Sequence, residues 1–517
     1  MPFLVTTKDV RKQPLGLAVL VVTGACILLS LSAHLSTFPG LHFDEAWFGL
    51  EALRIQSQGL TSAHGMRTYT GALYPWLLAE AFQVWPPGVL ALRLPGALLN
   101  AGAFAVLLVA VERLGGRRSA ALFALLFGSS LLFLWMSRVA WEVSALQPLL
   151  LATMLAALLG AGRRDRWTGP GVALFLMASN LGVFNHLIFA AIPTSFLAAA
   201  LVAGAGRKDA STAALVWIGT LAVVSMLLVL LVKVMLPDAI FARWHALFVV
   251  AFLVWPVALA RSARATPTAL EGRLERANPR WFLVLLMLGV AAFAAVHGIA
   301  FLGTLANVLV MKRMDSWDPP LSGTLLGYAW GLTLLGAFAT IARTTIQRVR
   351  QRGDLGVSDL VTLWALACLG ALTVLISKQA IRYYILPNVL FLTALALSLP
   401  ARRAIARPFA VAAVLAFLFV NGVAWRGILE DTNRRPLRFL VGTTHESSAH
   451  FLRLDPVVRE LEARGACRTE AAKYIELPLE FYRATRPPAC GNQDVYRARY
   501  CETCPPAYIT LQPVERP

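Results

Sequence analysis

Runs of mostly apolar residues recur along this chain and are separated by short polar segments. A helix of about 20 apolar residues crosses the hydrocarbon core of a bilayer, so the pattern predicts about 13 transmembrane helices. The predicted spans are 15–35, 88–111, 119–136, 143–161, 168–185, 187–205, 212–235, 246–260, 281–310, 322–342, 359–377, 383–399 and 408–424. We therefore expect an all-α polytopic membrane protein.

The segment between the first two spans, 36–87, is long and rich in aromatic residues. Within it, 46–58 and 71–85 have the apolar spacing of amphipathic helices, which settle in the plane of the membrane interface. The alternative is that 71–87 forms an extra span. Its shortness, the charge of Glu80 and the stop at Pro86-Pro87 argue against that alternative.

The composition changes after the last span. Residues 426–517 are polar and contain no further span, so we expect a transmembrane domain at 1–425 followed by a soluble domain at 426–517. The pattern predicts a helix at 456–464 and strands at 474–478 and 507–511, which suits a small α/β domain.

Four of the six cysteines lie in this last segment: Cys467, Cys490, Cys501 and Cys504. An even number of cysteines outside the cytoplasm is typical of structural disulfides, and three pairings are open. The spacing of Cys501 and Cys504 also occurs in zinc and redox sites, but a second such pair is lacking. Cys26 and Cys368 fall inside apolar runs and are expected to be packing residues.

Composition and charge agree with a membrane protein. Of the 517 residues, 58% are hydrophobic and only 15% are charged, against roughly 25% charged in soluble domains. The net charge of +19 is spread over short clusters between the spans, so nucleic acid is not an expected partner. We interpret the first apolar run as a retained helix and not as a cleaved signal.

The basic clusters fall in alternate loops: 113–118, 163–166, 207–208, 261–280, 343–352 and 402–407. The positive-inside rule assigns these loops, and the basic N-terminus, to the cytoplasm. The loop 36–87 and the C-terminal segment are then outside.

Two adjacent carboxylates, Asp44 and Glu45, follow the first span on that outer side. Such a pair is costly beside a bilayer, and a carboxylate there can deprotonate a hydroxyl or hold a metal. A solvated loop pair without a role is the alternative. Other polar residues predicted at this boundary favour a polar cavity on the same side. They are Arg138, Glu142, Asn185, His186, Asp238, Arg243, His245, Asp315, Asp318, Lys378, Arg382, Tyr383 and Tyr384.

These motifs, in this order, resemble the GT-C membrane glycosyltransferases. The motifs are Asp44-Glu45 after the first span, the segment 91–97 that opens the second, Ser137-Arg138 with Glu142, and Lys378 with 382–387. The pattern is most similar to the protein O-mannosyltransferase and lipid A aminoarabinose transferase group (glycosyltransferase families 39 and 83), over roughly residues 10–400.

The resemblance implies transfer of one sugar, a hexosyl or pentosyl unit, from a polyprenyl-phosphate donor to an extracytoplasmic lipid, surface glycan or protein. It implies a place in the bacterial inner membrane with a periplasmic active site, and a role in lipopolysaccharide or protein glycosylation of the cell envelope. Asp44 would be the base of an inverting reaction, and Glu45 would support it or bind the acceptor. The remaining expected roles are the donor phosphate site (Arg138, Lys378, Arg382 and Tyr383) and the acceptor cavity (Glu142, His186 and Tyr384). No second acidic motif is evident, which leaves a divalent metal open as a cofactor.

A transporter or flippase of lipid-linked substrates is the alternative function. Transporters usually show repeated halves and helices broken at the bilayer midplane, and neither is visible in this sequence. A purely structural membrane subunit would leave Asp44-Glu45 and Arg382-Tyr383-Tyr384 unexplained.

Overall fold

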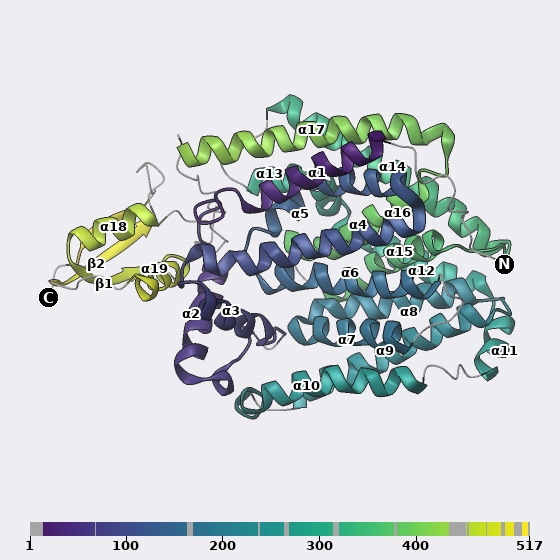
Figure 1. The fold of residues 1–517 in the computed structure, drawn as a ribbon, viewed down its shortest axis with the longest axis horizontal. Coiled ribbons are helices and arrows are strands. Elements are labelled where there is room, and N and C mark those ends of the chain that lie inside the picture. Colours follow the sequence, from purple (N-terminus) through teal and green to yellow (C-terminus); the bar gives the residue numbers. More distant parts are fainter. Residues whose placement is uncertain are drawn as a thin grey trace.

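The computed structural model of the chain describes residues 14–67, 69–162, 169–235, 238–262, 268–313, 320–376, 380–433, 451, 454–471, 473–486, 492–500 and 509–514. Long helices packed side by side form most of the molecule, and a small unit of helices and strands projects from one end (Figure 1). The helices of the bundle are α1 (Pro14–Ser32), α4 (Val89–Gly128), α6 (Glu142–Gly162), α7 (Gly169–Asn185), α8 (Ala191–Gly204), α9 (Ala210–Met235), α10 (Asp238–Ser262), α12 (Pro279–Leu305), α14 (Leu321–Arg350), α15 (Val357–Leu375), α16 (Ile385–Ser398) and α17 (Arg403–Asn433).

In the described part of the chain, eight helical segments are long and apolar enough to cross a membrane. Three shorter apolar helices accompany them: Gly16–Ser32, Glu142–Leu158 and Leu247–Arg261. The spans predicted from the sequence are largely helical, although the helix is interrupted at 129–130 within 119–136 and at 306–307 within 281–310. The chain is a largely helical, multi-pass membrane protein.

Helix α4 contains the predicted span 88–111 and the first part of the predicted span 119–136, up to Gly128. The helix is broken at Gly116, whose φ of 76° and ψ of −178° are not helical. A positive φ is open to glycine without steric cost, and nothing lies within 4 Å of a Cβ built at Gly116. The backbone conformation, and not a close neighbour, therefore calls for glycine there.

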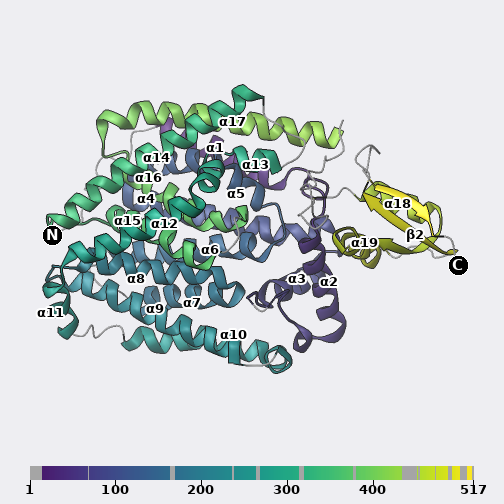
Figure 2. The ribbon, with the colours of Figure 1, turned by 180° about the vertical axis from the view of Figure 1, so that it is seen from behind.

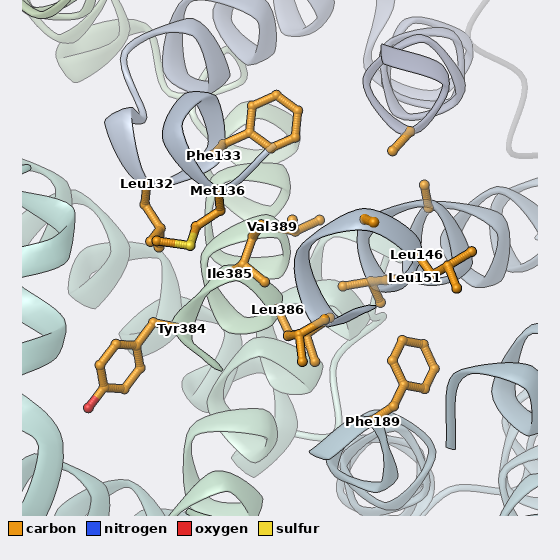
Figure 3. Close-up of a cluster of buried hydrophobic side chains, with 14 of the residues drawn as sticks. Leu132, Phe133, Met136, Leu146, Leu151, Phe189, Tyr384, Ile385, Leu386 and Val389 are labelled. Carbon is orange, nitrogen blue, oxygen red and sulfur yellow. The ribbon is translucent and has the colours of Figure 1, made fainter. Parts of the chain in front are cut away.

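Short helices also pack against the bundle. They are α5 (Leu131–Met136), α11 (Thr268–Arg276), α13 (Val308–Arg313), η3 (Leu187–Ala190) and η4 (Ile381–Tyr384). Side chains of α5, α6 and α16 form a buried apolar cluster beside Tyr384 (Figure 3). The Ser130 hydroxyl joins two of these elements, because it accepts from Asn388 at 2.7 Å and caps α5. The cluster fixes η4, and with it Arg382, against α5 and α6.

The predicted outer loop contains the two expected helices, α2 (Phe43–Gln58) and α3 (Leu73–Val84), with the short η2 (Leu60–Ser62) between them. Helix α2 begins with a capping box. The His42 ring nitrogen Nδ1 accepts from the Asp44 amide, and the Glu45 carboxylate accepts from the His42 amide. Both groups satisfy amides at the helix start that have no intrahelical partner. The capping box therefore fixes the Glu45 carboxylate and the backbone of Asp44 at the helix start.

Helix α17 continues to Asn433, past the predicted boundary at 425. The C-terminal unit then comprises α18 (Asp455–Ala463), β1 (Ala466–Ala471), α19 (Lys473–Thr485), β2 (Asn492–Tyr500) and β3 (Ile509–Pro513). Strand β2 is central, parallel to β1 and antiparallel to β3. The predicted helix at 456–464 is confirmed, and β3 overlaps the predicted strand at 507–511.

The predicted strand at 474–478 is wrong, because these residues lie in α19. Tyr474, Ile475, Leu479 and Tyr482 are buried, and their spacing of three to four residues is that of one helix face. The β-forming Tyr-Ile pair and Pro478 masked this periodicity. Cys490, Cys501 and Cys504 lie outside the described residues, as does the side chain of Cys467, so the disulfides stay a prediction.

Helix α19 attaches the C-terminal unit to the outer loop. The Phe481 ring lies against Gly49 of α2 and 6.4 Å from the ring of Phe82 on α3. Both views of the molecule place this unit at the same end of the bundle as α2 and α3 (Figures 1 and 2).

Candidate active site

Glu45 is the most enclosed polar residue of the motif at the start of α2. Its side chain is 0% exposed. It accepts two hydrogen bonds from the Arg93 guanidinium, both at 2.8 Å, and one each from the amides of Ala140 and His42. A bidentate arginine–carboxylate pair is strong and directional, so Glu45 ties α2 to α4 and to the turn before α6.

Arg93, near the N-terminal end of the apolar α4, completes this junction. Its remaining N–H groups donate to the carbonyl oxygens of Leu35, Pro39 and Gly40 in the turn before α2. These hydrogen bonds satisfy backbone carbonyl groups in a turn outside regular secondary structure. The sequence motif 91–97 contains Arg93, but no role was predicted for it. An arginine within an apolar span is a signal of a structural or functional role.

Asp44, next to Glu45, has a different partner. Its Oδ2 atom is 3.0 Å from the Nη1 atom of Arg382 on η4, which lies 338 residues away along the chain. The Asp44 side chain is 11% exposed and that of Arg382 is 27% exposed. This ion pair is therefore open to a ligand, whereas the Glu45–Arg93 pair is closed to one.

Aromatic rings surround the Asp44–Arg382 pair. The Arg382 guanidinium lies 5.1 Å from the ring centre of Trp141 and 5.4 Å from that of Tyr383. The His42 ring packs edge-on against Trp141 at 4.9 Å. Phe451, from the C-terminal segment, lies 5.1 Å from His42 and 5.2 Å from Trp135. Such rings hold a cation in place and offer apolar faces to a ligand.

His42 is oriented to donate a hydrogen bond toward this space. Burial lowers the pKa of its imidazole, although the charges of Asp44 and Glu45 act in the opposite direction. A neutral ring whose Nδ1 accepts from the Asp44 amide carries its proton on Nε2. That atom has no hydrogen-bond partner among the described residues.

Two further donors in the same cluster, Trp141 Nε1 and Arg382 Nε, also lack a partner in the described part of the chain. Buried polar groups nearly always have partners in a complete assembly. Three unpaired donors around one carboxylate are suited to a ligand rich in acceptor oxygens.

Glu142 and His186 form the other side of the site. The Nε2 atom of His186 is 3.8 Å from Oε1 of Glu142, and both side chains are buried. The His186 ring lies between Tyr69, at 5.2 Å, and Tyr383, at 5.6 Å. Lys233 of α9 donates to the Phe184 carbonyl nearby and acts electrostatically on Glu142. Lys233 and Tyr69 had no role in the sequence interpretation, because their nearness to Glu142 comes from folding alone.

Backbone hydrogen bonds join the Glu142–His186 side of the site to the outer loop. Thr70 and His186 form an isolated antiparallel bridge. The Leu187 amide donates to Tyr69 and the Gly71 amide donates to Asn185, both at 2.9 Å. Gly71 is required by this close approach, since a Cβ atom there would lie 2.2 Å from the Phe184 carbonyl oxygen.

The other residues predicted at the site have different positions. Arg138 is buried and donates to the carbonyl oxygens of Ser30, Ala33 and Phe38, so it holds the end of α1. Tyr384 turns away from Arg382, and its hydroxyl is 3.1 Å from Nδ1 of His297 on α12. Lys378 lies outside the described residues.

A divalent metal needs several oxygen or nitrogen ligands that converge on one point. Within the described residues, no group of three or more His, Cys, Asp or Glu side chains converges in this way. Asp44 is paired with Arg382 and Glu45 with Arg93. The donor set described here therefore does not fit a metal centre.

Comparisons with known proteins find similarity in structure only. No protein-family profile matches the sequence, and no curated protein matches it. Among solved structures, the Archaeoglobus fulgidus oligosaccharyltransferase tethered to an acceptor peptide matches with 15% identity and a TM-score of 0.49, over 80% of this chain and 55% of that one. The form of that enzyme with zinc and sulfate matches with 17% identity and a TM-score of 0.47, over 78% and 53%.

ArnT from Cupriavidus metallidurans, bound to undecaprenyl phosphate, matches with 14% identity and a TM-score of 0.33, over 76% of this chain and 79% of that one. Both kinds of protein are GT-C glycosyltransferases. The chain spans about half the length of the archaeal structures that it matches. All three TM-scores are below 0.5, and the function proposed below is argued from the side chains around Asp44.

Proposed function

We propose that this chain is a glycosyltransferase that moves one sugar from a polyprenyl-phosphate donor to an acceptor hydroxyl at the outer face of the membrane, with Asp44 as the base. The observation that carries the proposal is the Asp44–Arg382 pair at 3.0 Å. It combines, at the partly open edge of the bundle, a carboxylate able to take a proton and a guanidinium able to hold a phosphate.

The proposed reaction is a direct displacement. The acceptor hydroxyl oxygen attacks the anomeric carbon and passes its proton to Asp44. The bond between that carbon and the phosphate oxygen breaks, and its electron pair leaves on the polyprenyl phosphate. Arg382 stabilises the negative charge that develops on this leaving group. Attack from the face opposite the phosphate inverts the configuration of the sugar.

The same pair couples donor binding to activation of the base. Before the donor binds, the Oδ2 atom of Asp44 accepts a hydrogen bond from Arg382, so this oxygen is not available to an acceptor hydroxyl. The phosphodiester of the donor carries one negative charge and offers two acceptor oxygens to the Arg382 guanidinium, so it competes with Asp44 for this cation. Its arrival draws Arg382 from Asp44 and leaves the carboxylate free for the acceptor proton.

The surrounding residues suit a sugar. Trp141 and Tyr383 offer apolar faces, and the unpaired donors on His42 and Trp141 suit hydroxyl oxygens. Glu142 with His186 lies on the far side of Arg382, where we place the acceptor. Glu45 is a positioning residue in this proposal, since its four hydrogen bonds leave it no free face. Lys378 remains a proposed second contact to the phosphate.

The cellular setting belongs to the same proposal. We assign this site to the periplasmic side of a bacterial inner membrane, and the alternation of basic loops supports the assignment to the outer side. Hexosyl or pentosyl donors, and a lipid, surface glycan or protein acceptor, are consistent with the mixed polar and aromatic lining.

Two variants of the pair test the proposal by opposite effects on binding and turnover. Asp44→Asn should lower sugar transfer by about 10²–10⁴-fold, the usual contribution of a general base. The same variant should bind undecaprenyl phosphate as tightly as the unmodified chain or more tightly, because the competitor for Arg382 has lost its charge. Arg382→Ala should weaken that binding, and Arg382→Lys should restore only part of it.

Glu80→Gln is the matched control, since Glu80 is an exposed carboxylate of α3 that forms no ion pair in the described structure. Turnover is measured in membranes with undecaprenyl-phosphate sugars, and binding is measured on the purified chain with undecaprenyl phosphate. Near-normal turnover of Asp44→Asn would remove the assignment of the base. Unchanged affinity of Arg382→Ala for undecaprenyl phosphate would show that another cation binds the phosphate.

A further inference from the structure

A groove of about 1220 Å³ lies between α12 and α14, next to the end of α11. Its residues are of two kinds. Arginines stand at its mouth, and apolar side chains form its walls. None of these residues belongs to the site around Asp44.

The groove is at the opposite end of the bundle from that site. Helix α12 is 27 residues long, which is roughly 40 Å at 1.5 Å per residue. His297, near its C-terminal end, contacts Tyr384 beside the site, whereas the groove surrounds its N-terminal end. Both ribbon views place α11 and α2 at opposite ends of the molecule (Figures 1 and 2).

Four arginines come together at the mouth from three helix ends. Arg276 lies in the last turn of α11, Arg280 in the first turn of α12, and Arg350 and Arg352 at the end of α14. All four are exposed. Within the described residues, none of them forms an ion pair with a carboxylate, and only Arg276 has a side-chain hydrogen bond, to the Gly272 carbonyl.

Arg352 also has an uncommon backbone conformation. Its φ is 53°, directly after the last residues of α14, where a helix usually ends on glycine. A side chain kept at such a position despite its cost often has a role. Here the conformation places a fourth cation at the mouth of the groove.

The walls are apolar and open to the surroundings of the bundle. Val284 is 47% exposed, Met287 is 44% exposed and Leu288 is 61% exposed. They are accompanied by Leu283, Ala291 and Ile346. An apolar surface of this kind on a membrane-spanning helix faces lipid chains.

We propose that this groove is a binding site for an anionic phospholipid, with its phosphate among the four arginines and an acyl chain along the wall of α12. Basic pockets between transmembrane helices at the cytoplasmic surface bind acidic headgroups in this way. A soluble phosphate would use the arginines but not the wall. The combination of both surfaces is what selects a lipid.

The test compares lipids and charge-matched variants on the purified full-length chain. Native mass spectrometry measures binding of phosphatidylglycerol and of phosphatidylcholine with the same acyl chains. We expect the unmodified chain to prefer phosphatidylglycerol. One arginine near an acidic headgroup contributes about fivefold in affinity, so Arg280→Gln with Arg350→Gln should weaken phosphatidylglycerol binding by about 25-fold.

Arg261→Gln with Arg407→Gln is the control, because it removes the same charge from exposed arginines that do not line the groove. Its affinity should stay within about twofold of the unmodified chain. Ala291→Trp keeps every charge but fills the wall, and it should also abolish binding.

Three results would overturn the proposal. One is equal binding of the two lipids by the unmodified chain. Another is an equal loss in the control pair, which would indicate diffuse attraction to net charge. The third is unchanged binding in Ala291→Trp, or full competition by soluble glycerol phosphate, since either would leave no role for the acyl chain. Sugar transfer is not part of the measurement, so the outcome is independent of the function proposed for Asp44.

Discussion

Two adjacent carboxylates at the start of α2 have separate roles because they point in different directions. Successive residues of a helix are about 100° apart around its axis. Glu45 consequently faces Arg93 in the interior, and Asp44 faces Arg382 at the edge of the bundle. The sequence predicted that the pair matters, but it could not divide the roles, because the partners are 48 and 338 residues away.

The Glu45–Arg93 pair leads to a stability prediction. Glu45→Gln keeps the shape of the side chain but leaves the fully buried Arg93 without a counter-charge. Breaking one partner of a buried pair costs about 3–5 kcal/mol. We expect a clear fall in the melting temperature of the purified chain, measured by differential scanning fluorimetry in detergent.

The comparison with Asp44→Asn makes this result specific. Asp44→Asn should change the melting temperature much less, since Arg382 retains contact with solvent and with two aromatic rings. Adding Arg93→Met to Glu45→Gln should restore part of the loss by removing the stranded charge. A Glu45→Gln chain that melts like the unmodified one would contradict the structural role of this pair.

At the scale of helices, the sequence was most informative where length and apolarity decide the outcome. Every predicted span is largely helical, and so are the two stretches of the outer loop, but the breaks at 129–130 and 306–307 were not predicted. The prediction was wrong where contacts with distant parts of the chain determine the secondary structure. The segment 474–478 was predicted as a strand. It is helical because one face of α19 packs against α2, a contact that the local sequence does not reveal.

The contact between α19 and α2 provides a prediction at this scale. A Cβ atom at Gly49 would lie 2.3 Å from the Phe481 ring, so Gly49→Val must displace that ring. Overpacking of this kind costs about 1–3 kcal/mol. We expect faster release of the C-terminal unit in limited trypsin digestion, while the helical bundle stays intact.

Gly336→Val in α14 is the control for this experiment, because nothing lies within 4 Å of a Cβ built at that glycine. It introduces the same side chain into a helix without affecting the contact. Phe481→Ala should reproduce the effect of Gly49→Val by removing the other partner. Equal digestion of Gly49→Val and the unmodified chain would show that this contact does not hold the unit in place.

At the scale of the whole molecule, the site draws on the outer loop, α6, α7, η4 and the C-terminal segment. The charge pattern predicted that Asp44, Glu142, His186 and Arg382 share one side of the membrane, and the structure brings them together. It could not predict that Arg138 binds backbone carbonyls, since its role depends on the turn after α1. Trp141 and Phe451 were missed because an aromatic residue in an apolar region gives no signal of its own.

The orientation of the bundle in the membrane can be tested by cysteine labelling. Ser57 is exposed at the end of α2, and Ser211 is exposed at the start of α9, near the opposite end. The positive-inside rule puts Ser57 outside and Ser211 inside. A membrane-impermeant maleimide should label Ser57→Cys in intact cells, and it should label Ser211→Cys only after permeabilisation.

The chain without an added cysteine supplies the background labelling for both variants. The reverse pattern would place Asp44 in the cytoplasm, and the proposed periplasmic reaction would then be untenable.

Phe451, in the segment that leads to the C-terminal unit, contributes to the site around Asp44. Because its ring lies against His42 and Trp135, a chain shortened at Asn433 would lose part of the wall beside Asp44. The bundle and the C-terminal unit are therefore not interchangeable modules. In the proposed reaction Phe451 lies on the His42 side of Arg382, away from the Glu142–His186 side assigned to the acceptor. Exchanging the C-terminal segment between related chains would then alter which donor sugars fit and leave the reacting groups untouched.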